Sequence, residues 1–332
     1  MNPSRPARPG KPITATALLL AICLATLACT GNQPGPSSPA STPAPSPVAS
    51  GEASADPGDS PSPGDAGADN LDVGEDPVPP SPSLPAFSPP PLLSPSAATA
   101  GLVLHVPILM YHRIVPPAQA GNSLPGLVVP PELFAAQMDT LASAGWHTIT
   151  AAQLVADLAA GTRPGPRTFV ITFDDGYDDG YTYALPILQA HGFVASYYVI
   201  AGRIGNPPGP DQALTPGHVQ ALVDAGMEIG NHTVHHVNLT RFSGAALTYQ
   251  VSGASARIAE LVGSAPTTLA YPFGRWNLET ETAVRDAGMD LGLTTVEGAR
   301  ETWATRYATP RVRVSPSTSP AKLLALVSRA WP

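Results

Sequence analysis

The stretch TFVITFDDG, residues 168–176, decides the fold of this chain. Residues 168–173 are apolar and β-branched, a composition that favours a buried strand. Asp174, Asp175 and a glycine follow at once, where ligands bind in a βα fold. Adjacent carboxylates repel each other, so a compensating charge, usually a cation, is expected. The alternative is that one acid caps the next helix and the other is solvated.

Strand-like and helix-like segments alternate around this stretch from about residue 101 onward. Further strands are predicted at 103–114, 195–200, 227–230, 269–272, 291–295 and 312–314. Helices are predicted at 131–145, 181–191, 216–226, 246–262, 278–288 and 319–331. Several of them end in glycine, as a left-handed C-cap requires. Another predicted helix ends at Gly161. Alternating βα units indicate a parallel sheet or barrel, and about 230 residues suit one (β/α) barrel.

A second cluster of polar residues, GNHTVHH, occupies residues 230–236 after a short apolar segment. His232 and His236 are four residues apart, which can place both imidazoles on one face of a helix or helical turn. The alternative is a solvated histidine cluster. One carboxylate with two histidines is a common three-ligand set for zinc or a similar divalent ion, with one coordination position left open.

Two further segments are weaker signals when taken alone. The stretch LAYPFG, residues 269–274, is compatible with an ordinary strand followed by a turn. His112 ends the first predicted strand within VPILMYHR, residues 106–113, where a structural histidine is the simpler interpretation.

The amino terminus resembles an export signal. Three basic residues precede an apolar run from about Ile13 to Ala28, which is shorter than the ~20 residues of a spanning helix. Cys29 follows Leu27-Ala28 in a pattern that resembles a bacterial lipoprotein cleavage site, although Thr26 stands where such sites usually carry leucine. We therefore predict a signal peptide of lipoprotein type over residues 1–29. Simple secretion and an uncleaved anchor are the alternatives.

Residues 30–100 have the composition of a tether. They contain 18 prolines and one aromatic residue, Phe87, and they carry acidic but no basic side chains. Such a segment buries too little apolar surface to offset its chain entropy. A disordered linker is predicted here, joining the signal to a catalytic domain over residues 101–332. This order predicts an extracytoplasmic protein, lipid-anchored or secreted, that touches a membrane only through its amino-terminal anchor.

Cysteine and charge distribution exclude several classes. Both cysteines, Cys23 and Cys29, lie in the first 30 residues, so the folded part has no disulfide scaffold, cysteine nucleophile or thiolate zinc site. The net charge is −8, and residues 101–332 carry 14 basic and 17 acidic side chains without a basic stripe. A nucleic-acid partner is therefore not expected.

The motifs together resemble one family. Asp174-Asp175, HTVHH at 232–236 and YPFG at 271–274 occur in the order and spacing of the polysaccharide deacetylases, the NodB-homology or carbohydrate esterase family 4 enzymes. The resemblance covers about Leu104 to Val314 and implies a distorted (β/α) barrel. The opening PILMYHR and the form of YPFG look like the branch of exopolysaccharide poly-N-acetylglucosamine deacetylases.

The resemblance also implies residue roles. Asp175, His232 and His236 would bind one divalent ion, with zinc expected first and cobalt or nickel as alternatives. Asp174 would be the general base. The backbone N–H of Phe273 would help to hold the oxyanion. The hydroxyl-bearing Thr233 would tie down the metal-binding loop.

Two departures from the family pattern need replacements. Ala270 stands where many members carry the arginine that orients the base, and Arg275 is the candidate substitute by proximity in sequence. No histidine follows His236, although many members take their general acid from a histidine near the carboxyl end. The branch resemblance points instead to His112 as the acid.

The expected activity is removal of N-acetyl groups from a β-linked N-acetylglucosamine polysaccharide, and the protein is expected to be a monomer. Tyr177, Tyr271 and Trp276 are candidate stacking surfaces for the polymer, although core packing is the simpler role for any single one of them. An acetyl-xylan-type O-acetyl esterase is the rival enzyme, since the same site could cleave esters. A non-catalytic carbohydrate-binding barrel is the third hypothesis, suggested by the two departures.

Overall fold

The computed structural model describes residues 87–206 and 211–330. The predicted signal peptide over residues 1–29 and the predicted linker up to residue 86 lie outside these residues. Within the described part of the chain, no helix combines the length and apolar character that crossing a bilayer demands.

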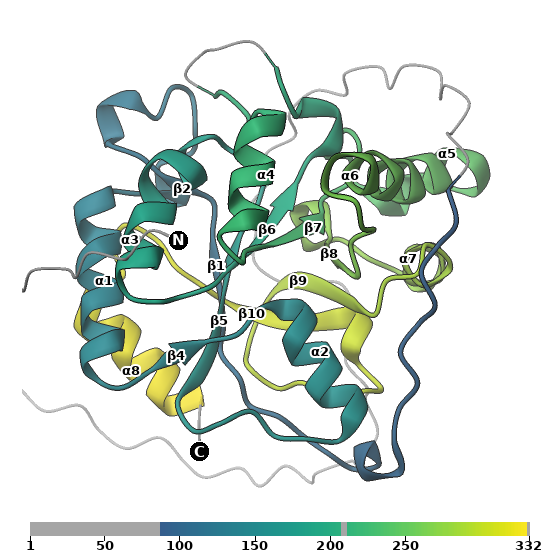
Figure 1. The fold of residues 1–332 in the computed structure, drawn as a ribbon, viewed down its shortest axis with the longest axis horizontal. Helices are drawn as coiled ribbons and strands as arrows, with labels where there is room; N and C mark the ends of the chain where they lie inside the picture. The colour runs from purple at the N-terminus through teal and green to yellow at the C-terminus, as the bar shows by residue number, and fades with distance from the viewer. Residues whose placement is uncertain (1–86, 207–210, 331–332) are drawn as a thin grey trace, which may run out of the picture. The chain divides into compact units, whose positions relative to one another are not determined.

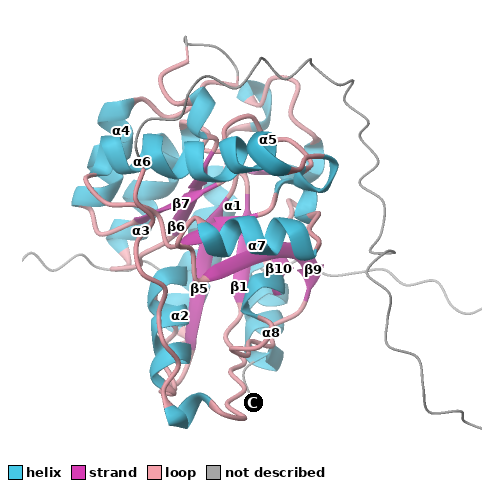
Figure 2. Cartoon of the chain, turned by 90° about the vertical axis from the view of Figure 1, so that its right-hand side faces the viewer, coloured by secondary structure: helices cyan, strands magenta, loops and turns pink. Residues whose placement is uncertain are grey.

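Parallel strands form the centre of the fold (Figures 1 and 2). The strands are β1 Ile108–Tyr111, β2 Arg113–Ile114, β3 Val128–Val129, β4 His147–Thr148, β5 Thr168–Phe173, β6 Ser196–Val199, β7 Glu228–Asn231, β8 Thr268–Ala270, β9 Leu291–Glu297 and β10 Thr309–Arg313. Neighbours follow the order β1-β10-β9-β8-β7-β6-β5, and β1 also pairs with β5, which closes a seven-stranded parallel barrel. Strand β4 adds to β5, while β2 and β3 pair separately. The predicted (β/α) barrel is confirmed.

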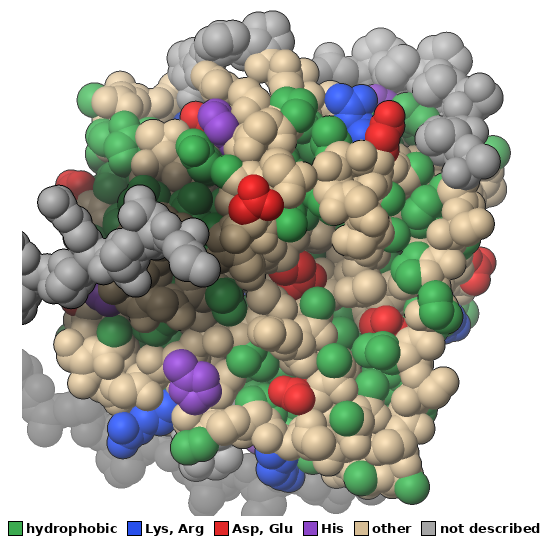
Figure 3. All heavy atoms as spheres, in the orientation of Figure 1, with side chains coloured by type: hydrophobic (Ala, Val, Ile, Leu, Met, Phe, Trp, Pro, Cys, Tyr) green, Lys and Arg blue, Asp and Glu red, His purple; other side chains and the backbone are tan. Residues whose placement is uncertain are grey.

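Helices surround the strands (Figure 1). Their bounds are α1 Pro131–Ser143, α2 Ala151–Ala160, α3 Leu185–Ala190, α4 Pro216–Asp224, α5 Gly244–Thr248, α6 Ala254–Val262, α7 Leu278–Asp286 and α8 Pro320–Ala330. Two π-helical turns interrupt this pattern, Gly180–Ala184 before α3 and Tyr249–Gly253 between α5 and α6. On the face drawn in Figure 3, lysine and arginine side chains occupy a few separate places.

Local sequence explains the elements that frame the barrel. All six residues of β5 are buried, because their side chains alternate between the barrel interior and the surrounding helices. Helix α2 begins with a capping box between Thr150 and Gln153 and ends at Gly161, whose φ of 75° is left-handed. The helix end predicted at Gly161 is therefore confirmed.

The folded part begins before the predicted boundary at residue 101. The Leu93 N–H donates to Asp290 Oδ1 at 2.9 Å. The hydroxyls of Ser96 and Thr99 donate to the carbonyls of Ala160 and Ala159. These last carbonyls of α2 have no partner within their own helix, so side chains from the end of the predicted linker satisfy them. Proline and serine composition did not reveal this docking, because the partners are remote in sequence.

Strand register brings the candidate residues to one rim of the barrel. Tyr111 at the end of β1 lies opposite Phe173 at the end of β5. Asn231 at the end of β7 pairs with Val199 of β6 and with Leu269 of β8. Because all these strands run parallel, the residues that follow β1, β5, β7 and β8 emerge at the same end.

Candidate metal centre and active site

Asp175, His232 and His236 converge at this rim. Asp175 Oδ1 lies 3.3 Å from Nε2 of His232 and 3.3 Å from Nε2 of His236. One potential ligand atom from each residue lies within 4.8 Å of the other two. Asp174 and Asp175 are only 3% and 8% exposed, so the alternative of a solvated acid after the strand is wrong.

The chemistry of these donors fits a divalent ion. Asp175 Oδ1 is buried and has no hydrogen-bond partner among the described residues. The Ala270 carbonyl lies 2.7 Å from His232 Nδ1 and can only accept, so the ring proton resides on Nδ1. This leaves the Nε2 lone pair of His232 facing Asp175. One carboxylate oxygen and two imidazole nitrogens suit a zinc-like ion.

A loop, and not a helical turn, brings the two histidines together. Thr233 and His236 adopt left-handed backbone conformations, with φ of 65° and 56°. The Thr233 N–H donates to Asn231 Oδ1 at 2.7 Å, and the His236 N–H donates to Thr233 Oγ1 at 2.9 Å. The sequence-based expectation of one helical face was therefore wrong, although Thr233 does tie the loop together. Reversal of the chain at positive φ turns both imidazoles toward Asp175.

The π-helical turn Tyr249–Gly253 supports this loop. The Gln250 carbonyl accepts from the Val234 N–H at 3.1 Å, and its side-chain oxygen accepts from the His235 N–H at 3.1 Å. The Gln250 side-chain NH₂ lies 3.0 Å from His235 Nδ1. Asn231 Nδ2 reaches the Val251 carbonyl at 2.9 Å from the other end of the loop. His235 therefore holds the loop to the helix and does not join the other two histidines.

Arg311 is the functional partner that sequence reasoning missed. Its Nη1 and Nη2 donate to Oδ1 and Oδ2 of Asp174 at 2.8 and 2.7 Å. Its Nε donates to the Thr294 carbonyl at 2.8 Å, and the side chain is fully buried. The expected substitute, Arg275, is exposed and makes no such contact among the described residues. An arginine in the middle of the largely buried strand β10, Thr309–Arg313, was the available signal.

Electrostatics keep both acids ionised. Burial raises the pKa of Asp174, but the charge and hydrogen bonds of Arg311 outweigh it, and the pKa falls below its usual value. Burial likewise opposes ionisation of Asp175, yet His232 and His236, whose Nε2 atoms each lie 3.3 Å from Asp175 Oδ1, hold its pKa well below the ordinary range. Burial lowers the pKa of His236 to about 4, so this imidazole is neutral at pH 7.

His112 enters the site beside Asp174. The Asp174 N–H donates to the Tyr111 carbonyl at 3.0 Å, so the residues that follow β1 and β5 leave the barrel side by side. Burial lowers the pKa of His112, while the charges of Asp174 and Asp175 oppose that effect. The structure therefore brings the histidine singled out in the first strand close to both acids.

Phe273 lies at the edge of the site in the turn Pro272–Gly274. Its φ is 58°, and its ring centroid lies 4.6 Å from that of His236. The N–H groups of Gly274 and Arg275 close the turn by donating to Tyr271 and Pro272, whereas the Phe273 N–H takes no part in these bonds. The Phe273 N–H, which is the amide expected to hold an oxyanion, is therefore not used by the hydrogen bonds that close the turn.

The three aromatic residues expected to stack on a polymer differ in position. Tyr271 is only 1% exposed and packs in the core, which is the core-packing alternative and not a stacking surface. Tyr177 is half-buried, and the guanidinium carbons of Arg113 and Arg203 lie 4.3 and 5.2 Å from its ring centroid. Trp276 is partly buried against the core beside α7.

Backbone strain is concentrated at this rim. Among the described residues, five non-glycine residues have positive φ, and Asp175, Thr233, His236 and Phe273 are four of them. Each such residue costs of order 1–3 kcal/mol and persists only where its surroundings enforce it. The polar network described above supplies that enforcement.

Comparisons with known proteins identify the family of this chain. A family model described as polysaccharide deacetylase matches residues 161–292. YxkH of Bacillus subtilis strain 168, whose name assigns it to the same family, is 33% identical over 214 residues, which are 64% of this chain and 73% of YxkH. The chain belongs to the polysaccharide deacetylase family. The protein is therefore a hydrolase, and its family is metal-dependent.

Solved structures of polysaccharide deacetylases share the fold. The Streptococcus pyogenes deacetylase PplD in complex with acetate has a TM-score of 0.61 and 28% identity, covering 67% of this chain and 97% of its own. IcaB from Ammonifex degensii has a TM-score of 0.58 and 22% identity, covering 68% of this chain and 97% of its own. The IcaB likeness shows the fold alone.

The hypothesis of a non-catalytic barrel rested on two departures from the family pattern, the missing arginine before Tyr271 and the missing histidine near the carboxyl end. Arg311 supplies the first and so removes one of these two reasons.

Proposed function

We propose that this polysaccharide deacetylase removes N-acetyl groups from a β-linked N-acetylglucosamine polysaccharide and releases acetate. The observation that carries the proposal is the position of Asp175 Oδ1, 3.3 Å from both histidine Nε2 atoms, beside an Asp174 that Arg311 holds by two hydrogen bonds. The three ligands would bind a divalent ion, and Asp174 is a separate carboxylate that can accept a proton. Hydrolysis of an amide by water requires both of these functions.

Asp175, His232 and His236 would hold the ion, with zinc as the first expectation. The ion would polarise the acetyl carbonyl and acidify the attacking water. Asp174 then accepts a proton from that water, since its carboxylate stays ionised beside Arg311. Arg311 restricts rotation of the carboxylate, so the proton acceptor keeps one orientation.

The remaining steps use Phe273 and His112. As water attacks the carbonyl carbon, the Phe273 N–H donates to the oxygen that gains negative charge. The C–N bond then breaks, and His112 in its protonated form donates a proton to the departing amine nitrogen. Water and the N-acetyl sugar thus yield acetate and a free amino sugar, with all atoms accounted for.

The substrate class rests on three supports. PplD, at 28% identity, binds acetate, the product expected here. The opening PILMYHR resembles the poly-N-acetylglucosamine branch. The export signal and tether in the sequence would hold the domain outside the cytoplasmic membrane, lipid-anchored or secreted, where exopolysaccharide and cell-wall glycans occur.

An acetate-release assay tests this function. Full-length protein is incubated with β-linked N-acetylglucosamine oligomers and, separately, with acetylated xylan, each with and without a chelator. We expect acetate from the oligomers, loss of activity with chelator and recovery with zinc. The Asp174→Asn variant should bind metal but lose turnover. Preferential release from xylan would identify the O-acetyl esterase instead, and no release from either would refute the proposal.

A further inference from the structure

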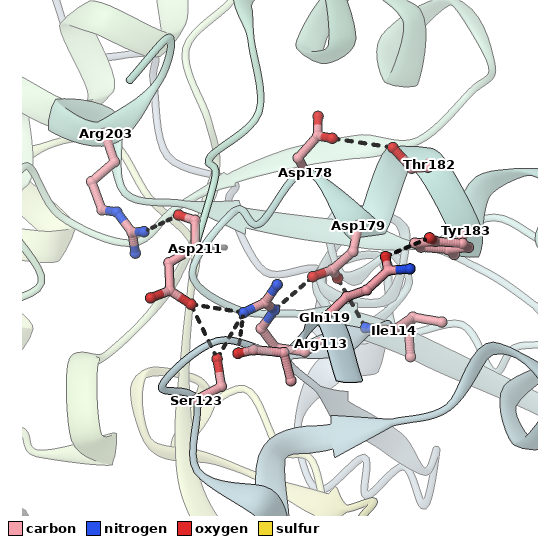
Figure 4. Close-up of polar contacts among 11 residues, drawn as sticks. Arg113, Ile114, Gln119, Ser123, Asp178, Asp179, Thr182, Tyr183, Arg203 and Asp211 are labelled. Carbon is pink, nitrogen blue, oxygen red and sulfur yellow. Dashed lines mark hydrogen bonds and ion pairs between the residues drawn. The ribbon is translucent and has the colours of Figure 1, made fainter. Parts of the chain in front are cut away.

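A buried ion pair lies next to the rim of the barrel where the proposed metal ligands converge. Arg113 Nε and Asp179 Oδ2 are 2.6 Å apart, with side chains only 4% and 5% exposed. Asp179 Oδ1 accepts from the Ile114 N–H at 2.9 Å (Figure 4). One carboxylate therefore binds both residues of β2, one through its side chain and the next through its backbone.

The ion pair connects the two segments that carry the proposed acid and base. Arg113 directly follows His112, and Asp179 follows Asp175 by four residues. Strands β1 and β5 are already in register up to Tyr111, where the β1 ladder ends. Beyond this point the Arg113–Asp179 pair, with the Ile114 bond, continues the connection that the strands no longer provide.

Arg113 is held from further directions. Its Nη1 donates to the Ala120 carbonyl at 3.1 Å and to Ser123 Oγ at 2.7 Å. The same atom pairs with Asp211 at 2.9 Å (Figure 4). With these partners and the Tyr177 ring, the guanidinium has one orientation, and so does the backbone next to His112.

The pair is poorly explained as a source of stability. Burial raises the pKa of Asp179, and the charge of Arg113 and the Ile114 N–H do not fully reverse that effect. Buried ion pairs often contribute little net stability, because desolvation offsets their attraction. Fixed geometry is what such a pair provides here.

We propose that Arg113 and Asp179 are positioning residues that hold His112 at the correct place relative to Asp174 and Asp175. The inference rests on the proposed function, because it assumes that His112 protonates the leaving amine. It adds that the Arg113–Asp179 ion pair, which lies beyond the paired strands β1 and β5, fixes the position of the proton donor. Loss of this ion pair should impair departure of the amine more than attack by water.

Two substrates separate these steps. A β-linked N-acetylglucosamine oligomer has a poor leaving group and needs a proton on nitrogen. The ester 4-nitrophenyl acetate releases a phenolate that needs no proton, so it reports on the metal, Asp174 and the attack step alone. The His112→Ala variant gives the reference pattern for loss of the acid.

The test compares kcat, KM and bound metal for Asp179→Asn and Arg113→Lys in the full chain. We expect kcat on the oligomer to fall at least 10-fold in both, with KM changed less than 3-fold. Hydrolysis of 4-nitrophenyl acetate should fall less than 3-fold, and metal content should remain that of the wild type. Glu281→Gln, which removes the 2.7 Å ion pair with Arg285 on α7, is the control and should change neither substrate.

A variant that leaves one buried charge unpaired could fail to fold. The double variant Arg113→Gln, Asp179→Asn removes both charges together and avoids that problem. A parallel loss on both substrates, or unchanged amide turnover in the folded double variant, would overturn the positioning role alone. If the wild type releases acetate from the oligomer but His112→Ala does so equally well, both the acid assignment and the positioning role are overturned, while the deacetylase activity stands.

Discussion

Arg311 and Asp174 form a bidentate ion pair inside the barrel, with Nη1–Oδ1 and Nη2–Oδ2 distances of 2.8 and 2.7 Å, although they are 137 residues apart in sequence. The arginine that the sequence pattern lacks before Tyr271 is thus supplied from β10. Its planar guanidinium matches the carboxylate, which sets the orientation of the base.

Replacement of Arg311 tests this relationship. Arg311→Lys keeps a positive charge but cannot make two parallel hydrogen bonds, so we expect kcat on the oligomer to fall about 10- to 100-fold. Metal content should remain unchanged, because Asp175 and the histidines are intact. Arg275→Lys is the matched control at an exposed position and should retain full activity. Equal losses in the two variants would contradict the assignment.

The Thr233 hydroxyl should determine metal affinity. Thr233→Val keeps the shape but removes the acceptor for the His236 N–H, so the loop can relax from its left-handed conformation. Loss of a supporting contact of this kind typically weakens metal binding about 10- to 100-fold. Competition with a chromophoric chelator measures the affinity. Thr233→Ser keeps the oxygen and should bind the metal within about threefold of the wild type.

Gly274 should be intolerant of a side chain. A Cβ there would lie 2.2 Å from Thr295 Oγ1 and 2.6 Å from its amide nitrogen, and φ is +65°. Gly274→Ala should therefore displace the Phe273 N–H and lower oligomer kcat about 100-fold, as for loss of an oxyanion donor. Gly263→Ala is a control with φ of +78° and open space around the Cβ. It should lower stability slightly and leave kcat unchanged.

Glu301 should make stability depend on pH. It is 1% exposed, its Oε2 accepts from the Val106 N–H, and burial raises its pKa to about 8. Above pH 4.5 the unfolded chain releases this proton while the folded chain keeps it, so this group lowers stability as pH rises from about 4.5 to about 8.

Urea unfolding of wild type and Glu301→Gln at pH 5 and pH 8 measures this contribution. The variant cannot ionise, so its stability relative to the wild type should improve by about 1–3 kcal/mol between these two pH values. Glu279→Gln, at an exposed position, should follow the wild type at both pH values. A constant difference between wild type and Glu301→Gln would show that Glu301 does not titrate abnormally.

Cys29 should control localisation. The lipoprotein-type signal predicts that the wild type fractionates with membranes and that Cys29→Ser moves to the soluble extracytoplasmic fraction. Cys23→Ser lies in the same apolar run and should not change the distribution. Identical fractionation of all three proteins would leave simple secretion or an uncleaved anchor.

Sequence motifs predicted the barrel and, through the family resemblance, all three proposed metal ligands, because these signals are short-range. Strand β5 was predicted with its observed bounds, since six buried residues followed by two acids form one continuous pattern. The spacing of His232 and His236 identified the ligands but gave the wrong conformation. Two residues at positive φ replace the expected helical turn, and periodicity does not report such reversals.

The sequence by itself pointed to Asp174, Asp175, His232 and His236 as the proposed base and metal ligands, because motifs of adjacent residues keep their spacing in any conformation. Only the tertiary structure decided that Arg311 rather than Arg275 meets Asp174, that His235 joins Gln250 and not the other histidines, and that residues before 101 dock on α2. The Arg311–Asp174 contact depends on closure of the parallel barrel, in which β1 pairs with both β10 and β5. Closure brings strands distant in sequence within hydrogen-bonding reach, and no local pattern records which partner lies across it.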